Sequence, residues 1–131
     1  MTPERIQIIE AARNICGALK LRDEFSAGGV GAALRTTKGN IYTGICLDLG
    51  SGLGFCAEVA AIAEMLKNRE TQIELIVAVA GNRIMPPCGR CRETMAQVDK
   101  RNLECRVLLG EDQEIPLKEL LPKHWLDAKH K

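Results

Sequence analysis

Three cysteines in two short motifs have the spacing to hold one zinc ion. The first motif is Cys56-Ala57-Glu58, and the second is Pro87-Cys88-Gly89-Arg90-Cys91. Zinc prefers four ligands in tetrahedral geometry, so a site with three thiols leaves one position open for water, which is typical of a catalytic metal. Glu58 follows Cys56 by two residues and can face that open position without binding the metal. The motifs therefore predict a catalytic zinc site in which Glu58 acts as general base and then as general acid.

A structural zinc site or a redox-active Cys-x-x-Cys pair is the alternative interpretation of these motifs. A structural site would need a fourth Cys or His ligand. Cys105, His124 and His130 are candidates, but none of them has the helix-start position expected for Cys56 and Cys88. The spacing therefore favours the catalytic site.

The elements that must position these motifs follow from apolar periodicity and turn residues. We expect, in chain order, a helix from residue 3 to about 20, strands at 28–36 and 41–47 joined by a turn at 38–40, a loop at 49–55, a helix at 56–67, a strand at 73–80, a loop at 82–87, a helix at 88–100, a strand at 103–109 and a helix at 116–121. Strands separated by helices predict an α/β fold, in which helices pack on a mixed sheet. Both zinc motifs then begin helices, whose N–H groups and dipole favour thiolate.

Length and composition indicate one globular domain over residues 1–131. Hydrophobic residues make up 46% of the chain, charged residues make up 27%, and the formal net charge is +1. The sequence has no basic run, so neither a nucleic-acid groove nor binding to an anionic membrane is indicated. No apolar stretch approaches the roughly 20 residues of a membrane span, and no secretion signal precedes the first helix, so a cytoplasmic location is expected. In that reducing compartment, six cysteines favour a metal site over disulfides.

Five segments make the chain similar to the cytidine deaminase family. They are FSAGGVGAAL (25–34), NIYTG (40–44), CAE (56–58), PCGRCRE (87–93) and LLP (120–122). The resemblance implies a three-layer α/β/α sandwich with a central mixed five-stranded sheet, and one zinc ion per subunit held by Cys56, Cys88 and Cys91. It implies hydrolytic deamination of a cytosine nucleoside, with Glu58 as the proton shuttle. It also implies a homotetramer whose subunits complete one another's active sites.

The positions expected to contact the substrate are Cys46, Asp48, Ala57, Pro87, Arg90 and Trp125. Typical family members carry Asn-x-Glu, which holds the ribose hydroxyls, where this chain has Cys46-Leu47-Asp48. Asp48 can replace the Glu with a side chain one methylene shorter, but Cys46 cannot reproduce the hydrogen bonds of Asn. Trp125 follows the LLP segment, and the resemblance implies that it packs near the substrate base; packing near the terminus is the alternative. Gly28-Gly29 replaces the family's Phe-Pro and removes an aromatic wall.

The second zinc motif is also similar to that of the blasticidin S deaminases, which carry Arg at the position of Arg90. In that branch the Arg faces a bulky substrate that bears a carboxylate, a role that guanidinium suits. The glycines of residues 50–54 would leave room for a larger substituent. Alternatively, Arg90 is a solvated residue at the helix start, and Arg83 and Arg92 have the same ambiguity.

We therefore predict a zinc-dependent hydrolytic deaminase that converts cytidine, deoxycytidine or a related cytosine nucleoside to the uridine product and ammonia. The alternatives are a deaminase of a blasticidin S-type aminonucleoside antibiotic, and a non-catalytic, zinc-stabilised binding protein. The intact Glu58 argues against the second alternative, because a binding protein has no chemical need for this carboxylate. An enzyme that edits RNA or DNA is disfavoured, because the chain has a near-neutral charge and one Trp, one Tyr and two Phe to stack on bases.

Overall fold

In the computed structural model, which describes residues 2–129, all strands belong to one seven-stranded sheet. In chain order the elements are α1 (Pro3–Ile15), β1 (Leu19–Arg22), β2 (Phe25–Thr36), β3 (Ile41–Asp48), α2 (Ala57–Lys67), β4 (Ile73–Ala80), β5 (Arg83–Met85), α3 (Gly89–Val98), the 3-10 helix η1 (Lys100–Glu104), β6 (Arg106–Gly110), β7 (Gln113–Pro116), α4 (Leu117–Leu120) and α5 (Trp125–Lys129). None of the helices in this described part is long and apolar enough to cross a membrane.

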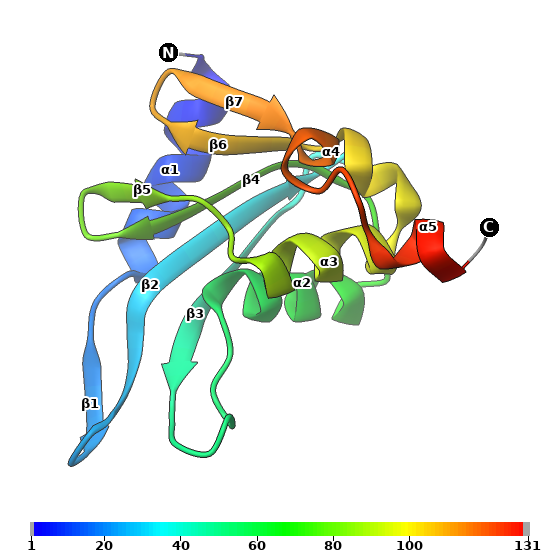
Figure 1. Cartoon of the computed structure of the whole chain (residues 1–131). Helices are drawn as coiled ribbons and strands as arrows, with labels where there is room; N and C mark the ends of the chain where they lie inside the picture. Colours follow the sequence, from blue (N-terminus) through cyan, green and yellow to red (C-terminus); the bar gives the residue numbers. More distant parts are fainter. Residues whose placement is uncertain (1, 130–131) are drawn as a thin grey trace.

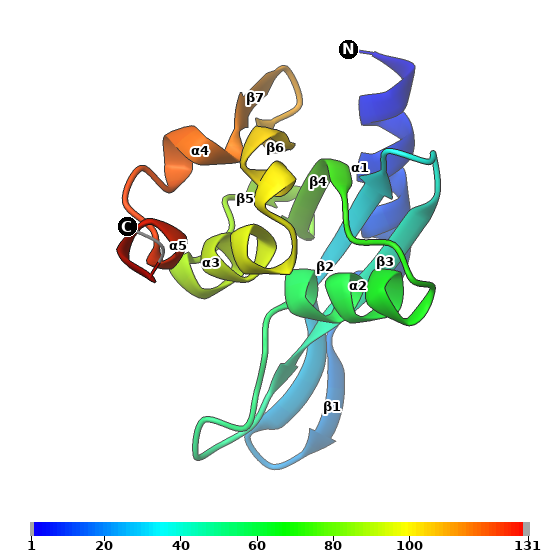
Figure 2. The same ribbon diagram turned by 90° about the vertical axis from the view of Figure 1, so that its right-hand side faces the viewer.

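Five strands form the body of the sheet, in the spatial order β3-β2-β4-β6-β7. The β4–β6 pair is parallel and the other pairs are antiparallel, so the mixed five-stranded sheet is confirmed. The two remaining strands are short additions, β1 on β2 and β5 on the end of β4. The β1–β2 hairpin and the end of β3 project beyond the helices in both views (Figures 1 and 2).

Helices cover both faces of this sheet, as the residues of β4 show. Leu75, Val77 and Val79 pack in a cluster with α1, whereas Ile76 and Ala78 pack in a second cluster with α2 and α3. Figure 1 shows α2 and α3 side by side, with α1 across the sheet from them. Burial on both faces explains the continuous apolar run at residues 75–80, and the three-layer sandwich is confirmed. Glu74, the one charged residue of β4, is partly exposed and pairs with Arg35 and Arg106.

The first helix is shorter than its periodicity predicts. Thr2 caps it, since its side chain accepts a hydrogen bond from the Arg5 N–H at 3.3 Å. The helix ends at Ile15 rather than near residue 20, because the Gly17 N–H donates to the Gly28 carbonyl at 2.7 Å. This bond turns the chain into β1, an exposed strand whose four residues are too few for their apolar–polar alternation to stand out from the helical spacing before it.

The strand expected at 103–109 also starts later, at Arg106. Asn102 is fully buried, and its amide group donates to the carbonyls of Thr71 and Met95 and accepts from the Ile73 N–H at 2.7 Å. These three bonds hold the chain in the 3-10 helix η1 before β6 begins. A single polar side chain therefore overrides the apolar run that suggested an earlier strand start.

Candidate metal and catalytic site

Three thiols lie close enough together to share one metal ion. The Sγ atoms of Cys56, Cys88 and Cys91 lie within 4.8 Å of one another, with 3.3 Å between Cys56 and Cys88 and 3.6 Å between Cys88 and Cys91. Zinc–sulfur bonds of about 2.3 Å in a tetrahedron separate the sulfurs by about 3.8 Å, so the spacing suits zinc. All three cysteines are free of disulfides. Among the described residues, no fourth Cys, His, Asp or Glu joins this cluster.

The candidates for a fourth structural ligand lie elsewhere. Cys105 is buried in the apolar core, and His124 faces Asp127 with 3.5 Å between Nε2 and Oδ2. His130 lies outside the described residues. Among residues 2–129 the cluster is therefore a three-ligand set with one coordination position left over, as expected for a catalytic site.

The sequence places two of the thiols at helix starts. Cys56 is the N-cap residue of α2, Cys88 is the N-cap residue of α3, and Cys91 lies in the first turn of α3. Both helices therefore direct the positive ends of their dipoles at the cluster, which favours thiolate. The two apolar helix faces that pack on the sheet fix the distance between the half-sites.

The thiols differ in how easily they ionise before a metal binds. Burial raises the pKa of Cys91, and the Glu58 carboxylate raises it further. Burial also raises the pKa of Cys56. At Cys88 burial acts in the same direction, but hydrogen bonds from the Cys91 and Arg90 backbones and from the other thiols outweigh it and lower the pKa overall. A bound dication would therefore displace protons from two reluctant thiols, which couples metal binding to pH.

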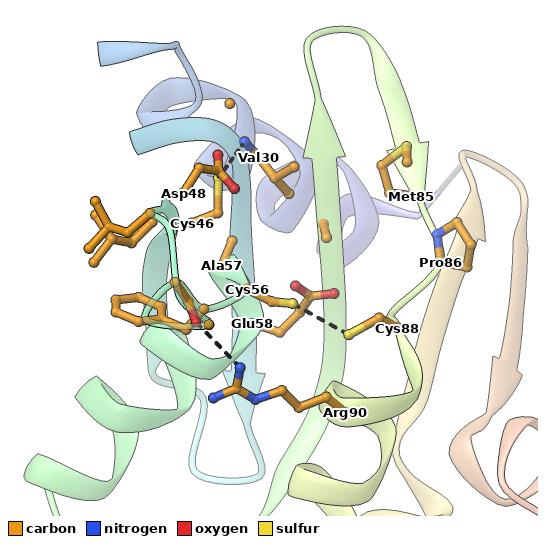
Figure 3. Close-up of a pocket in the computed structure, with 17 residues that line it drawn as sticks. Val30, Cys46, Asp48, Cys56, Ala57, Glu58, Met85, Pro86, Cys88 and Arg90 are labelled. Carbon is orange, nitrogen blue, oxygen red and sulfur yellow. Dashed lines mark hydrogen bonds between the residues drawn. The ribbon is translucent and has the colours of Figure 1, made fainter. Parts of the chain in front are cut away.

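Glu58 is a buried carboxyl group beside the thiol cluster. Only 4% of the residue is exposed, and Figure 3 shows its carboxylate next to the Cys56 and Cys88 side chains. Burial raises its pKa, while its own backbone N–H and the Cys91 thiol oppose that rise. The carboxylate is therefore tuned to bind a proton more readily than a solvated Glu, as proton transfer near neutral pH requires.

A cavity of about 700 Å³ opens in front of Glu58 and the thiols. Its wall is formed by Gly29, Val30, Cys46, Leu47, Asp48, Leu49, Gly52, Gly54, Phe55, Cys56, Ala57, Glu58, Ala78, Met85, Pro86, Cys88 and Arg90. It therefore brings together four of the predicted substrate positions: Cys46, Asp48, Ala57 and Arg90.

Two predicted substrate positions lie outside this cavity. Pro87 is buried beside Glu58 with Ile76, and the preceding Pro86 lines the cavity instead. Trp125 is 55% exposed at the start of α5, where its backbone N–H donates to the Glu93 carboxylate at 2.9 Å. Neither residue lines this cavity in the single chain, so the substrate contacts of Pro87 and Trp125 remain predictions.

The arginines near the second zinc motif have different roles. Arg90 reaches from α3 across the cavity rim, and its Nη1 donates to the Gly54 carbonyl at 3.4 Å (Figure 3). Arg92 instead donates to the carbonyls of Pro87 and Leu120, at 2.8 Å and 3.1 Å, and so ties the zinc loop to α4. Arg83 is exposed in β5. Sequence reasoning missed Met85 in the cavity wall, because the segment expected to be a loop pairs with β4.

Residues 6–106 match the family described as cytidine and deoxycytidylate deaminase zinc-binding region. A cytidine deaminase from Halalkalibacterium halodurans is 35% identical over 102 residues, which cover 75% of this chain and 77% of that protein. A blasticidin-S deaminase from Bacillus cereus is 31% identical over 106 residues, which cover 71% and 74%. The crystal structure of cytidine deaminase from Mycobacterium tuberculosis has a TM-score of 0.79 at 25% identity and covers 95% of this chain and 98% of that one. The chain therefore belongs to the cytidine and deoxycytidylate deaminase family, as a zinc-dependent hydrolase of the cytidine deaminase type.

Proposed function

We propose that the chain hydrolyses cytidine, deoxycytidine or a related cytosine nucleoside to the corresponding uridine product and ammonia. The observation that carries this proposal is the buried Glu58 carboxylate beside the three-thiol cluster, at the floor of a cavity of about 700 Å³. The named relatives add support, because proteins 35% and 31% identical to the chain are a cytidine deaminase and a blasticidin-S deaminase.

Glu58 supplies the proton transfers of this reaction. Zinc, when held by Cys56, Cys88 and Cys91, supplies the Lewis acidity that makes water nucleophilic near neutral pH. The Glu58 carboxylate takes a proton from the attacking water and delivers it to the ring nitrogen N3. It then carries a proton to the departing amine, so one water is consumed and one ammonia is released. Its burial keeps bulk water from competing for these protons.

A substrate panel tests the proposal directly. Formation of the uracil-containing product by zinc-loaded protein is measured with cytidine, deoxycytidine, free cytosine and blasticidin S, which would release ammonia, and with N4-substituted cytidines, which would release the substituted amine. We expect cytidine or deoxycytidine to be turned over with the highest kcat/KM. If none of these compounds is turned over, the result would favour a non-catalytic, zinc-stabilised binding protein instead.

Deamination of a blasticidin S-type aminonucleoside is the second candidate function. Arg90 places a guanidinium at the cavity rim, where it could pair with a carboxylate on an enlarged substrate. Gly29 lines the same cavity, and a Cβ added there would meet no atom within 4 Å, which leaves room for such a group. Activity on blasticidin S that falls in an Arg90→Ala variant, without activity on cytidine, would establish this candidate.

We also propose that the chain acts as a homotetramer in which subunits share active sites. Leu19 and Leu21 of β1 are 57% and 47% exposed, on the arm that projects beyond the helices (Figure 1). Leu53, in the loop after β3, is 68% exposed. Apolar side chains at such exposure suit contacts with other subunits. Assembly would also give Trp125 a cavity to enter, since it does not line that of its own chain.

A further inference from the structure

A break in the sheet beside the cavity leaves one backbone group for a side chain to satisfy. The register of β2 against β3 shifts between Ala27 and Gly31, so Val30 is not paired in the ladder. Its N–H donates instead to the Sγ atom of Cys46 at 3.3 Å (Figure 3). Cys46 is 7% exposed, so little water reaches this site, and its sulfur accepts the hydrogen bond that the Val30 N–H would otherwise donate to a neighbouring strand.

The same thiol also contacts the carboxylate of Asp48. The Cys46 Sγ atom donates to Asp48 Oδ2 at 3.6 Å, across two residues of β3 that point to the same side of the strand. A thiol has one hydrogen to donate and a sulfur that accepts weakly. Both capacities of Cys46 are therefore used within the protein, so its side chain has no donor left for a substrate.

Asp48 is the group that remains to bind the polar part of a substrate. Apart from the zinc-binding thiols and Glu58, the charged side chains in the described cavity wall are Asp48 and Arg90. Arg90 offers donors only, whereas a carboxylate accepts hydrogen bonds from hydroxyl or ammonium groups. Asp48 is exposed to the cavity, and among the described residues its Oδ2 accepts from the Cys46 thiol while its Oδ1 faces no donor, which leaves Oδ1 available.

We propose that Cys46 is a positioning residue, which links the Val30 N–H to Asp48 and so directs that carboxylate at a hydroxyl group of the substrate's sugar. The proposal rests on the proposed nucleoside deaminase function. It assigns recognition of the sugar to one carboxylate acceptor rather than to two side chains. Apart from Glu58, Asp48 is then the carboxylate of the described cavity wall that accepts a hydrogen bond from a sugar hydroxyl, and the enzyme depends on Cys46 only through Asp48.

A double-mutant cycle on kcat/KM tests the link between the two residues. Asp48→Asn is expected to lower kcat/KM for cytidine by about 10- to 100-fold, the effect of losing a hydrogen bond to a charged group. Cys46→Ala is expected to lower it by about 3- to 10-fold, mainly through KM, because the carboxylate loses its orientation. Cys46→Ala in the Asp48→Asn background is expected to cost nothing further. Cys46→Ser should stay near wild type, because a hydroxyl both donates and accepts.

Two controls separate positioning from packing. With 2′,3′-dideoxycytidine, which lacks the ring hydroxyls, neither Asp48→Asn nor Cys46→Ala should change kcat/KM. Cys16→Ala is the matched variant, since the Cys16 thiol also bonds to the backbone, by donating to the carbonyls of Gly29 and Val79, but does not line the cavity. Cys16→Ala should change kcat/KM for cytidine and for 2′,3′-dideoxycytidine by the same factor. Equal losses on both substrates for Cys46→Ala, or full additivity with Asp48→Asn, would overturn the positioning role.

Calorimetric titration with uridine distinguishes failure of this inference from failure of the proposed function. Uridine carries the ribose without the reacting amine, so its binding does not require turnover. Weaker uridine binding in both Asp48→Asn and Cys46→Ala would support the inference even if the wild-type protein released no ammonia, a result that would overturn the function alone. A wild-type protein that releases ammonia but binds uridine independently of Asp48 would overturn the inference alone.

Discussion

Glu58 shows how one residue's environment sets its chemistry. The Glu58→Gln substitution keeps the size of the side chain but removes its ability to take a proton from water. We expect kcat to fall by about 10²- to 10⁴-fold, the usual contribution of a positioned acid–base group, with one zinc per chain retained. Steady-state ammonia release and metal analysis of the same preparation measure both quantities. The control is Glu10→Gln on the exposed face of α1, which should be neutral; a Glu58→Gln enzyme with wild-type kcat would exclude the proton-shuttle role.

The cysteines divide into metal ligands and core residues. Cys88→Ala should lose both zinc and activity, because two thiols cannot hold the ion against competition from solvent. Cys105→Ala should keep one zinc per chain, since the Cys105 thiol is buried in the apolar core and burial raises its pKa to about 12. Zinc stoichiometry after dialysis against a weak chelator checks both variants. Stoichiometric zinc in Cys88→Ala would contradict the ligand assignment.

At the scale of elements, the sequence predicted those whose residues share one environment along their length. The strand at Ile73–Ala80 was predicted with its observed bounds, because it is buried on both faces. The starts of α2 and α3 follow from the zinc motifs, which are local in sequence. The short strands β1, β5 and β7 were missed, because they have three or four residues, none of them fully buried, and are defined by the strands they pair with.

Hydrogen bonds to Glu70 join the β2–β3 hairpin to the connection between α2 and β4. Hydrogen bonds from Thr36, Tyr42 and Asn40 hold the pKa of the buried Glu70 below its ordinary value, and the bond to Glu70 raises the pKa of Tyr42. The Glu70 contribution is present above its unfolded pKa and is lost as pH falls through the lower folded value. The Tyr42 contribution is present below its unfolded pKa and is lost as pH rises through the higher folded value.

Glu70→Gln should therefore lower the Tm most near neutral pH, between the lowered pKa of Glu70 and the raised pKa of Tyr42. The loss should shrink in acid, where Glu70 of the wild-type protein is itself protonated. Thermal unfolding from pH 3 to 11 measures the difference between variant and wild type. A Tm difference that stays constant over this range would mean that the ionised carboxylate contributes nothing to the hairpin.

The glycine-rich loop before Cys56 depends on one close contact between backbones. Leu47 and Phe55 exchange two hydrogen bonds, of 3.0 and 2.9 Å, which close the loop. A Cβ on Gly54 would overlap the Leu47 carbonyl, so Gly54→Ala should break this bridge and destabilise the fold by about 1–3 kcal/mol. Because Cys56 follows directly, zinc affinity should fall as well. Gly50→Ala is the control, since its Cβ would meet Phe25 at an ordinary 3.7 Å. Denaturant unfolding and zinc competition compare the two variants. Equal stability and equal zinc affinity would refute the role of the bridge between Leu47 and Phe55.

For the whole molecule, the sequence predicted the chemical centre of the site better than its walls. The thiols and Glu58 lie in two motifs whose helix starts fix them locally. The cavity wall instead combines β2, β3, the glycine-rich loop, the end of β5 and the residue after it, so Met85 and Pro86 could be placed only once the sheet was known. Trp125 shows the same limit at a larger scale, because its predicted contact with substrate needs a cavity other than that of its own chain.

Mixing two inactive variants tests whether subunits share active sites. If the partner subunit's Trp125 completes each cavity, Glu58→Gln and Trp125→Ala should each be inactive alone. Unfolding and refolding them together in equal amounts should restore about a quarter of the wild-type activity, because a quarter of the sites then combine an intact Glu58 with an intact Trp125 from a neighbour. Sedimentation should give the mixture the same mass as the wild-type protein, a multiple of the 14.4 kDa chain. If Trp125 acts within its own chain, every hybrid site carries a defect and no activity returns, so the absence of recovery in a mixture of normal mass would refute the shared site.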